Sequence, residues 1–208
     1  MRTIAFANLK PGTGKTTTTI LLAYGLHRRG FDVAVADCDP AQSALAWSDA
    51  VSGFPFPIYG LPVKDAGKRL VDIGGEKAWV VVDLPQAEDH AQIVRSVLRR
   101  VDEITVPVAP TPIEVERMSG ISDLLEEIDE VRQTPARTAV LLNRVVGGAR
   151  SGGDARAGLT ELGYEVLVPE IPRREVYALA YGAVPAIRDG DPIDQLVDTY
   201  LERAGVTA

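Results

Sequence analysis

A glycine-rich stretch near the start of the chain has the residue types that hold phosphate groups. Residues 9–16 read Leu-Lys-Pro-Gly-Thr-Gly-Lys-Thr. Gly12 and Gly14 would let the backbone curl so that its N–H groups converge on phosphate oxygens. Lys15 would place a positive charge against the β- and γ-phosphates, and the Thr16 hydroxyl would ligate Mg²⁺. The stretch is therefore predicted to bind the phosphates of a nucleotide.

Acidic residues follow two apolar runs further along the chain. Asp37 and Asp39 lie one residue apart at the end of the first run, and Asp83 ends the second. Ligands of open α/β sheets bind at the carboxyl ends of the strands, where these side chains would lie. Carboxylate oxygens suit Mg²⁺, and a carboxylate can also hold and polarise a water molecule. The alternative for Asp39-Pro40 is a helix cap and turn without a catalytic role.

Apolar runs of strand length alternate with stretches of helical periodicity, and these elements would position the side chains above. We predict strands over residues 3–8, 31–37, 78–83, 103–108, 138–143 and 165–168. We predict helices over residues 16–29, 87–100, 113–132 and 193–203, and a loop with one short edge segment over residues 51–62. This order predicts a doubly wound α/β fold, with a mostly parallel sheet covered by helices on both faces. The glycine-rich stretch would join the first strand to the first helix, which is the context that a phosphate loop requires.

The composition excludes several classes of protein. The 208 residues are 46% hydrophobic and 25% charged, which is typical of a globular chain and excludes an intrinsically disordered one. Cys38 is the one cysteine, so the chain can form neither an internal disulfide nor a Cys-Cys metal pair. No apolar run approaches the length of a membrane helix. We see no linker between domains and expect one domain over residues 1–208.

The glycine-rich stretch also resembles a known family. Residues 10–16 are similar to the deviant Walker A motif, K-G-G-x-G-K-[ST], of the ParA/MinD ATPases, and Lys10 matches the signature lysine of that motif. Pro11 departs from the motif, because the family usually has glycine there, and proline lacks an N–H group. Residues 37–40, Asp-Cys-Asp-Pro, resemble the family's second motif, D-x-D-P-Q. Asp83 occupies the position of a Walker B aspartate.

This resemblance implies a role for each matched residue. The catalytic residues would be Lys10, Lys15 and Asp39, with Asp39 orienting the attacking water. The Mg²⁺ site would involve Thr16, Asp37 and Asp83. Asn143 would lie near the adenine, in keeping with an amide that both donates and accepts hydrogen bonds. The full set of implied ATP contacts is Lys10, Pro11, Gly12, Thr13, Gly14, Lys15, Thr16, Thr17, Asn143 and Pro172.

The resemblance further implies a cytoplasmic DNA-partition protein of the small plasmid ParA type, a P-loop ATPase with ATP and Mg²⁺ as cofactors. ATP would drive formation of a homodimer that binds nonspecific DNA on the nucleoid, and Lys10 would reach the nucleotide of the partner protomer. A centromere-binding ParB-type protein would stimulate slow hydrolysis. The alternatives are a MinD-like or cargo-positioning ATPase and an ATP-dependent ligase of the dethiobiotin-synthetase type. The acidic tail from Asp191 onward argues against a MinD-like membrane anchor.

The charge pattern bears on DNA binding. The net charge is −7, which argues against constitutive binding of nucleic acid. The predicted helix 113–132 carries seven of the 29 acidic residues, whereas residues 144–174 carry more arginines than acids. These arginines would form a phosphate-binding face if they converge, and a dimer would double it. The sequence leaves open whether they converge or are scattered.

Overall fold

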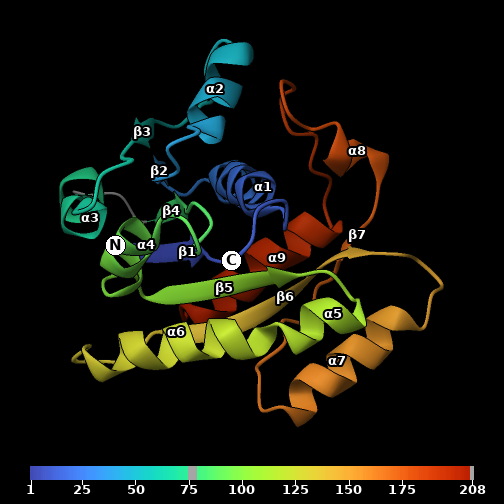
Figure 1. Cartoon of the computed structure of the whole chain (residues 1–208). Coiled ribbons are helices and arrows are strands. Elements are labelled where there is room, and N and C mark those ends of the chain that lie inside the picture. Colours follow the sequence, from blue (N-terminus) through green and yellow to red (C-terminus); the bar gives the residue numbers. More distant parts are fainter. Residues whose placement is uncertain (75–78, 207–208) are drawn as a thin grey trace.

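The protein is a seven-stranded parallel sheet with helices on both sides (Figure 1). The computed structural model describes residues 1–74 and 79–206. The strand order is β3-β2-β4-β1-β5-β6-β7, and every pairing is parallel. The strands are β1 (Arg2–Phe6), β2 (Val33–Asp37), β3 (Ile58–Gly60), β4 (Trp79–Asp83), β5 (Glu103–Val108), β6 (Arg137–Val145) and β7 (Ile171–Pro172). The predicted fold class is confirmed.

Apolar side chains alternate between the two faces of the sheet and form two core clusters. On one face Ala5, Val80 and Val82 pack with the helices α3, α4, α6 and α7. On the other face Ile4, Phe6 and Val81 pack with α1, α2 and α9. The helices are α1 (Lys15–Arg28), α2 (Ser43–Ala50), α3 (Ala66–Gly74), α4 (Ala91–Leu98), α5 (Pro112–Glu116), α6 (Met118–Glu130), α7 (Ser151–Glu161), α8 (Glu175–Ala178) and α9 (Pro192–Arg203). No helix among the described residues is long and apolar enough to cross a membrane.

The helices agree with the sequence patterns where those patterns are long. The predicted helices 16–29 and 193–203 correspond to α1 and α9, and the predicted helix 87–100 to the shorter α4. Residues 113–132 form two consecutive helices, α5 and α6, which meet at Arg117. The helices α2, α3, α7 and α8 were not predicted from the sequence. The glycines of α7 disfavour a helix, and burial of Ala155 and Leu159 against the sheet stabilises it.

The strand predictions hold for β1, β2, β4, β5 and β6, and β3 is the short edge segment expected within residues 51–62. The predicted strand 165–168 is wrong, because only Val166 pairs there, in an isolated bridge to Val140. Pro169 follows directly and has no N–H group to continue the ladder, so the last strand forms later, at β7. Ala78 of the predicted strand 78–83, and residues 207–208 of the predicted domain, lie outside the described residues.

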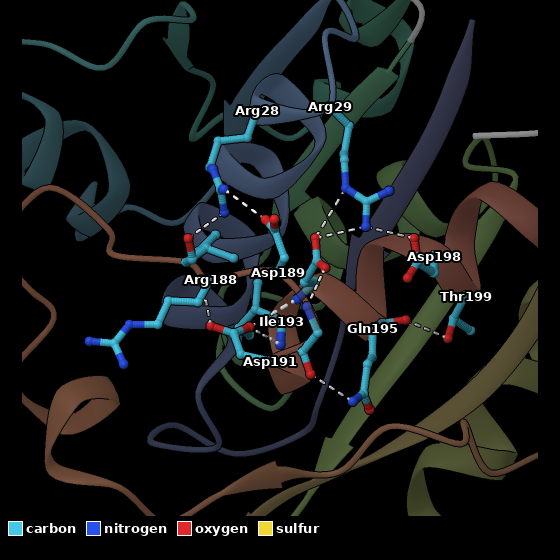
Figure 2. A network of polar contacts seen from close by, with 12 residues as sticks. Arg28, Arg29, Arg188, Asp189, Asp191, Ile193, Gln195, Asp198 and Thr199 are labelled. Atoms are coloured by element: carbon cyan, nitrogen blue, oxygen red, sulfur yellow. Dashed lines mark hydrogen bonds and ion pairs between the residues drawn. The ribbon is translucent and has the colours of Figure 1, made fainter.

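A network of charged side chains joins the end of α1 to the start of α9 (Figure 2). The guanidinium of Arg29 binds Asp194 at 2.8 Å and Asp198 at 2.9 Å, and Arg28 binds Asp189 at 3.1 Å. Asp191 caps α9 by accepting hydrogen bonds from the backbone N–H groups of Ile193 and Asp194. Because α1 begins at the glycine-rich loop, this network fixes the helix that carries the loop.

Candidate nucleotide-binding site

The glycine-rich loop joins β1 to α1, as the sequence predicts. Gly12 and Gly14 have φ values of 74° and 93°, which L side chains rarely adopt. Lys15 is the first residue of α1, and its ammonium donates a 3.0 Å hydrogen bond to the carbonyl of Lys10. The loop therefore curls back over itself at the N-terminus of a helix, where unpaired N–H groups and the helix dipole favour an anion.

Asn143, at the end of β6, holds the middle of the loop. Its Nδ2 donates a 2.8 Å hydrogen bond to the carbonyl of Thr13, and its Oδ1 accepts a 2.9 Å bond from the N–H of Arg144. A Cβ atom on Gly14 would lie 2.3 Å from Asn143 Nδ2, so glycine is required there by space as well as by φ. Asn143 thus braces the loop, and one N–H and one lone pair remain for a ligand such as adenine.

Asp83 has an unusual environment at the carboxyl end of β4. The residue is fully buried, and within the part of the chain that the structure describes neither carboxyl oxygen has a hydrogen-bond partner of normal geometry. Burial raises the pKa of Asp83 to about 8, and the negative charges of Asp37 and Asp39 act in the same direction. The Thr16 hydroxyl and the Lys15 ammonium oppose this shift. An unpaired buried carboxylate of this kind is the group that a bound cation would satisfy.

Asp37 lies beside Asp83, but both of its carboxyl oxygens accept hydrogen bonds from the backbone. Its Oδ1 accepts a 3.2 Å hydrogen bond from the N–H of Asp39, and its Oδ2 accepts a 3.0 Å bond from the N–H of Leu45 in α2. Burial raises the pKa of Asp37, although these backbone bonds oppose the shift. Asp37 therefore fixes the turn that carries Asp39, and its predicted part in the Mg²⁺ site stays a prediction.

Asp39 is half-buried at the mouth of this acidic group, and its Oδ1 accepts a 2.9 Å hydrogen bond from the N–H of Ala41. Burial lowers the pKa of the Lys15 ammonium, while the charges of Asp83 and Asp39 raise it again. The predicted catalytic residues Lys15 and Asp39 are therefore close enough to interact. The second oxygen of Asp39 remains available to hold a water molecule.

The donor set fits Mg²⁺ bound together with a nucleotide. Among residues 1–74 and 79–206, no three His, Cys, Asp or Glu side chains are placed to hold a metal by themselves. Mg²⁺ commonly keeps several waters and binds one or two carboxylates plus substrate phosphates. Asp83 and the Thr16 hydroxyl supply that kind of partial shell next to the loop.

A hollow of about 550 Å³ opens beside the loop on the side of β6 and β7. Four residues of the predicted ATP contact set line it: Gly14, Thr17, Asn143 and Pro172. Residues 109–111, Arg144 and Tyr177 also line it and are not in the predicted contact set, although the family resemblance of residues 106–112 and 171–187 implies a place near the nucleotide for two of these segments. The hollow is large enough for a nucleoside next to the phosphate loop.

Lys10 and Pro11 are not among the residues that line the larger hollow. Pro11 is exposed, and Lys10 lines a separate hollow of about 530 Å³ with Asn8 and Glu116. The Lys10 ammonium has no hydrogen-bond or ion-pair partner in the described part of the chain. The structure thus separates Lys10 from the other predicted contacts that line the larger hollow, and leaves its charge free.

Comparison with known proteins identifies the family of this site. Residues 4–183 match the model of the CobQ/CobB/MinD/ParA nucleotide binding domain. The chain belongs to this family. The match spans both the phosphate loop and the segment of Pro172, so the resemblance seen in the loop extends over most of the chain.

Relatives within the MinD/ParA family cover similar lengths. The chain is 30% identical over 181 residues to "Maintenance of carboxysome distribution protein A" of Halothiobacillus neapolitanus, covering 84% of this chain and 81% of that protein. It is 26% identical over 186 residues to "Protein ParA" of Rhizobium radiobacter, covering 87% and 82%. A Cyanothece McdA variant in complex with ATP has the same fold, with a TM-score of 0.77 and 17% identity over 100% of this chain and 98% of that one.

One buried polar residue of this MinD/ParA-type site was missed. Asn8 follows β1 and precedes Lys10 by two residues, and its side chain bonds both to the loop and to β5. A polar residue at the end of an apolar strand, directly before the loop, was the signal available in the sequence. Its tertiary partner on β5 is 99 positions away, and the sequence does not indicate that contact.

Proposed function

We propose that this ParA/MinD-type ATPase is a DNA-partition protein that binds nonspecific DNA as an ATP-dependent dimer. ATP and Mg²⁺ are its cofactors, and a centromere-binding partner of the ParB type would accelerate its slow hydrolysis. ATP binding would switch the protein to the DNA-bound form on the nucleoid, and hydrolysis would release it.

The observation that carries the proposal is the Lys10 ammonium, which has no partner among the residues that the structure describes. Its backbone carbonyl holds Lys15 within the loop, while its side chain lines a hollow apart from the larger one that Asn143 and Pro172 line. A lysine without a partner at the edge of a phosphate site can neutralise phosphate charge on a second protomer. In this proposal, hydrolysis therefore depends on assembly.

Other residues of the site would bind the phosphates, Mg²⁺, the attacking water and the adenine. The loop amides and Lys15 would bind the β- and γ-phosphates, and Mg²⁺ held by Thr16 and Asp83 would neutralise the charge that develops on them. Asp39 would hold the attacking water, because it is half-exposed and retains an unused oxygen. Asn143 would contact the adenine with its remaining hydrogen-bonding capacity.

The arginines of residues 144–174 support conditional DNA binding. Arg144, Arg173 and Arg174 are exposed and line the larger hollow, the one that the nucleoside would enter, so these three arginines lie near one another beside the nucleotide site. Arg156 does not belong to that face, because its guanidinium binds Glu170 at 3.0 Å. A dimer would present this face twice against a net charge of −7 per chain, which suits weak binding that appears only on assembly.

The deciding experiment compares nucleotides. We expect the protein with ATP and Mg²⁺, but not with ADP, to bind random duplex DNA at low salt and to double its mass in light scattering. Lys10→Ala should strongly weaken the dimer and reduce its hydrolysis to a low, still measurable rate. Lys68→Ala, which removes an exposed lysine from α3, should change neither. If DNA binding is absent with ATP at low salt, the partition function is wrong.

A second candidate function is the positioning of a protein cargo. The observation that favours it is the 30% identity to a protein named for carboxysome distribution. Both functions require the same ATP-dependent dimer, and they differ in the partner that stimulates hydrolysis. Pull-down of stimulating partners by the ATP-bound protein would separate a centromere-binding protein from a cargo adaptor.

A further inference from the structure

Asn8 joins three segments at the start of the phosphate loop. Its Nδ2 donates a 2.9 Å hydrogen bond to the carbonyl of Pro107 in β5, and its Oδ1 accepts a 3.2 Å bond from the N–H of Lys10. Its own carbonyl accepts a 3.2 Å bond from the N–H of Ala87, which follows β4. The side chain is largely buried, so water cannot replace these bonds at low cost.

The bond to Pro107 extends the sheet beyond the end of β1. The N–H of Ala7 donates to the carbonyl of Thr105, and the next carbonyl on that edge of β5 belongs to Pro107. The Asn8 side chain fills this next position where the β1 backbone has turned away into the loop. The loop therefore starts from a point that the central strands of the sheet hold rigidly.

The bond to Lys10 transmits that rigidity to the loop. The N–H of Lys10 is held by Asn8, and its carbonyl is held by the ammonium of Lys15. The backbone N–H and the carbonyl of Lys10 are thus both hydrogen-bonded to side chains, and this fixes the direction in which the Lys10 side chain leaves the backbone. The ammonium beyond it has no partner among residues 1–74 and 79–206.

We infer that Asn8 is a positioning residue, which holds Lys10 so that its ammonium projects from the loop toward a second protomer. This inference rests on the proposed function, in which Lys10 acts across the dimer. Asn8 itself touches no nucleotide in this scheme. Its contribution is to limit the freedom of Lys10, because a lysine that is free to rotate would lose several rotamers when it binds across an interface.

A double-mutant cycle tests the inference. Asn8→Ala should lower kcat for ATP hydrolysis with duplex DNA about tenfold, because Lys10 is no longer aligned, and should change the ATP dissociation constant less than about threefold. In a Lys10→Ala background, Asn8→Ala should lower kcat by less than about twofold, because the side chain that it positions is gone.

Asn143→Ala is the matched control in the same cycle. Asn143 is also a buried asparagine that holds the loop, but it binds the carbonyl of Thr13 rather than Lys10. In the double variant, the fold-decrease in kcat from Asn143→Ala should therefore be as large as it is without Lys10→Ala. The comparison separates a general loosening of the loop from loss of Lys10 alignment.

Asn8→Asp keeps the inference testable if Asn8→Ala folds poorly. Aspartate retains the oxygen that accepts from the Lys10 N–H but loses the N–H group that donates to Pro107. We expect Asn8→Asp to be less stable to heat than the unaltered protein and yet to keep a larger share of kcat than Asn8→Ala, because the bond to the Lys10 N–H remains although the support from Pro107 is lost. A purely structural role of Asn8 in the sheet would make both variants equally poor in turnover.

Two results would overturn the inference, and they differ from each other. If Lys10→Ala lowers kcat and Asn8→Ala lowers it again by the full factor, Asn8 does not act through Lys10, while the proposed dimer mechanism stands. If Lys10→Ala leaves the dimer and its hydrolysis intact, the proposed mechanism and the inference both fail. If Asn8→Ala has little further effect on kcat once Lys10 is removed, and Asn8→Asp is active, the inference is supported.

Discussion

Asp37 and Asp83 lie directly opposite each other on the neighbouring strands β2 and β4. Both are fully buried, and the N–H of Cys38 donates a 2.9 Å hydrogen bond to the backbone carbonyl of Asp83. Asp37 uses both carboxyl oxygens to hold backbone N–H groups, whereas neither oxygen of Asp83 has a partner of normal geometry. One of these two acids is therefore engaged by backbone N–H groups, and the other has the carboxyl that our proposal assigns to Mg²⁺.

The unpaired carboxyl of Asp83 should make its removal stabilising in the protein without nucleotide. Asp83→Asn removes a buried charge and should raise the free energy of unfolding by about 1–3 kcal/mol at pH 8. The same variant should lose Mg²⁺-dependent ATP hydrolysis. Thermal unfolding in EDTA and a phosphate-release assay measure the two effects. A variant less stable than the unaltered protein in EDTA would show that the Asp83 carboxyl is not a destabilising group.

This stabilisation should depend on pH in a defined direction. Because the pKa of Asp83 is raised from 3.8 to about 8 by folding, the unfolded chain releases its proton first as the pH increases. The Asp83 carboxyl therefore lowers the free energy of unfolding progressively between about pH 4 and about pH 8. The gain in free energy of unfolding from Asp83→Asn should be small near pH 5 and largest near pH 8. An advantage that stays constant over this range would show that the carboxyl does not titrate as described.

Gly12 and Gly14 provide a matched pair for the geometry of the loop. Gly12→Ala adds a methyl group in open space at φ 74° and should cost about 1 kcal/mol of stability. Gly14→Ala also forces the methyl group against Asn143 and should cost a further 1–3 kcal/mol, roughly, with loss of ATP affinity. Denaturant unfolding and a fluorescent-nucleotide titration test both. Equal effects of the two variants would argue against the close approach of Gly14 and Asn143.

The ionised Asp194 carboxylate should stabilise the protein at neutral pH, and its protonation in acid should remove that stabilisation. Burial alone would raise its pKa, but hydrogen bonds from the Gly190 N–H and the Arg29 guanidinium outweigh burial and hold the pKa below its usual value. This stabilisation is complete above the ordinary pKa and is lost as the pH falls through the lowered one. Asp194→Asn should cost about 1–3 kcal/mol at pH 7 and progressively less below pH 4. Asp49→Asn, which changes an exposed side chain of α2, should cost no free energy of unfolding in urea at either pH.

The arginines around the larger hollow should determine the salt dependence of DNA binding. Arg144→Glu or Arg173→Glu should weaken ATP-dependent DNA binding. The slope of the logarithm of the binding constant against the logarithm of salt concentration should become shallower by about one for each DNA phosphate that the variant no longer neutralises. Arg100→Glu, an exposed change just after α4, is the control and should affect binding little. Titrations at several salt concentrations measure the slope. An equal decrease in affinity for all three variants would indicate a general effect of net charge.

The elements that the sequence predicted well share one physical property. Their apolar residues follow a local period, as in β2, β4 and α9, and the burial of those residues dictates both the element and its face. The predicted strand 165–168 failed because Pro169 ends the pairing after one bridge, although the apolar run itself looks like a strand. α7 was missed because its glycines conceal a helix that packing against the sheet stabilises.

The sequence by itself determined the phosphate loop, the acids at the strand ends and the parallel fold, because local patterns of glycine, charge and apolar residues encode them. The tertiary structure decided how the site residues are used. It engages both oxygens of Asp37, and among the described residues it gives those of Asp83 no partner of normal geometry. It also joins Asn143 to the Thr13 carbonyl and Asn8 to the Pro107 carbonyl. These roles depend on hydrogen bonds between segments far apart in the chain, which only the packed sheet brings within reach.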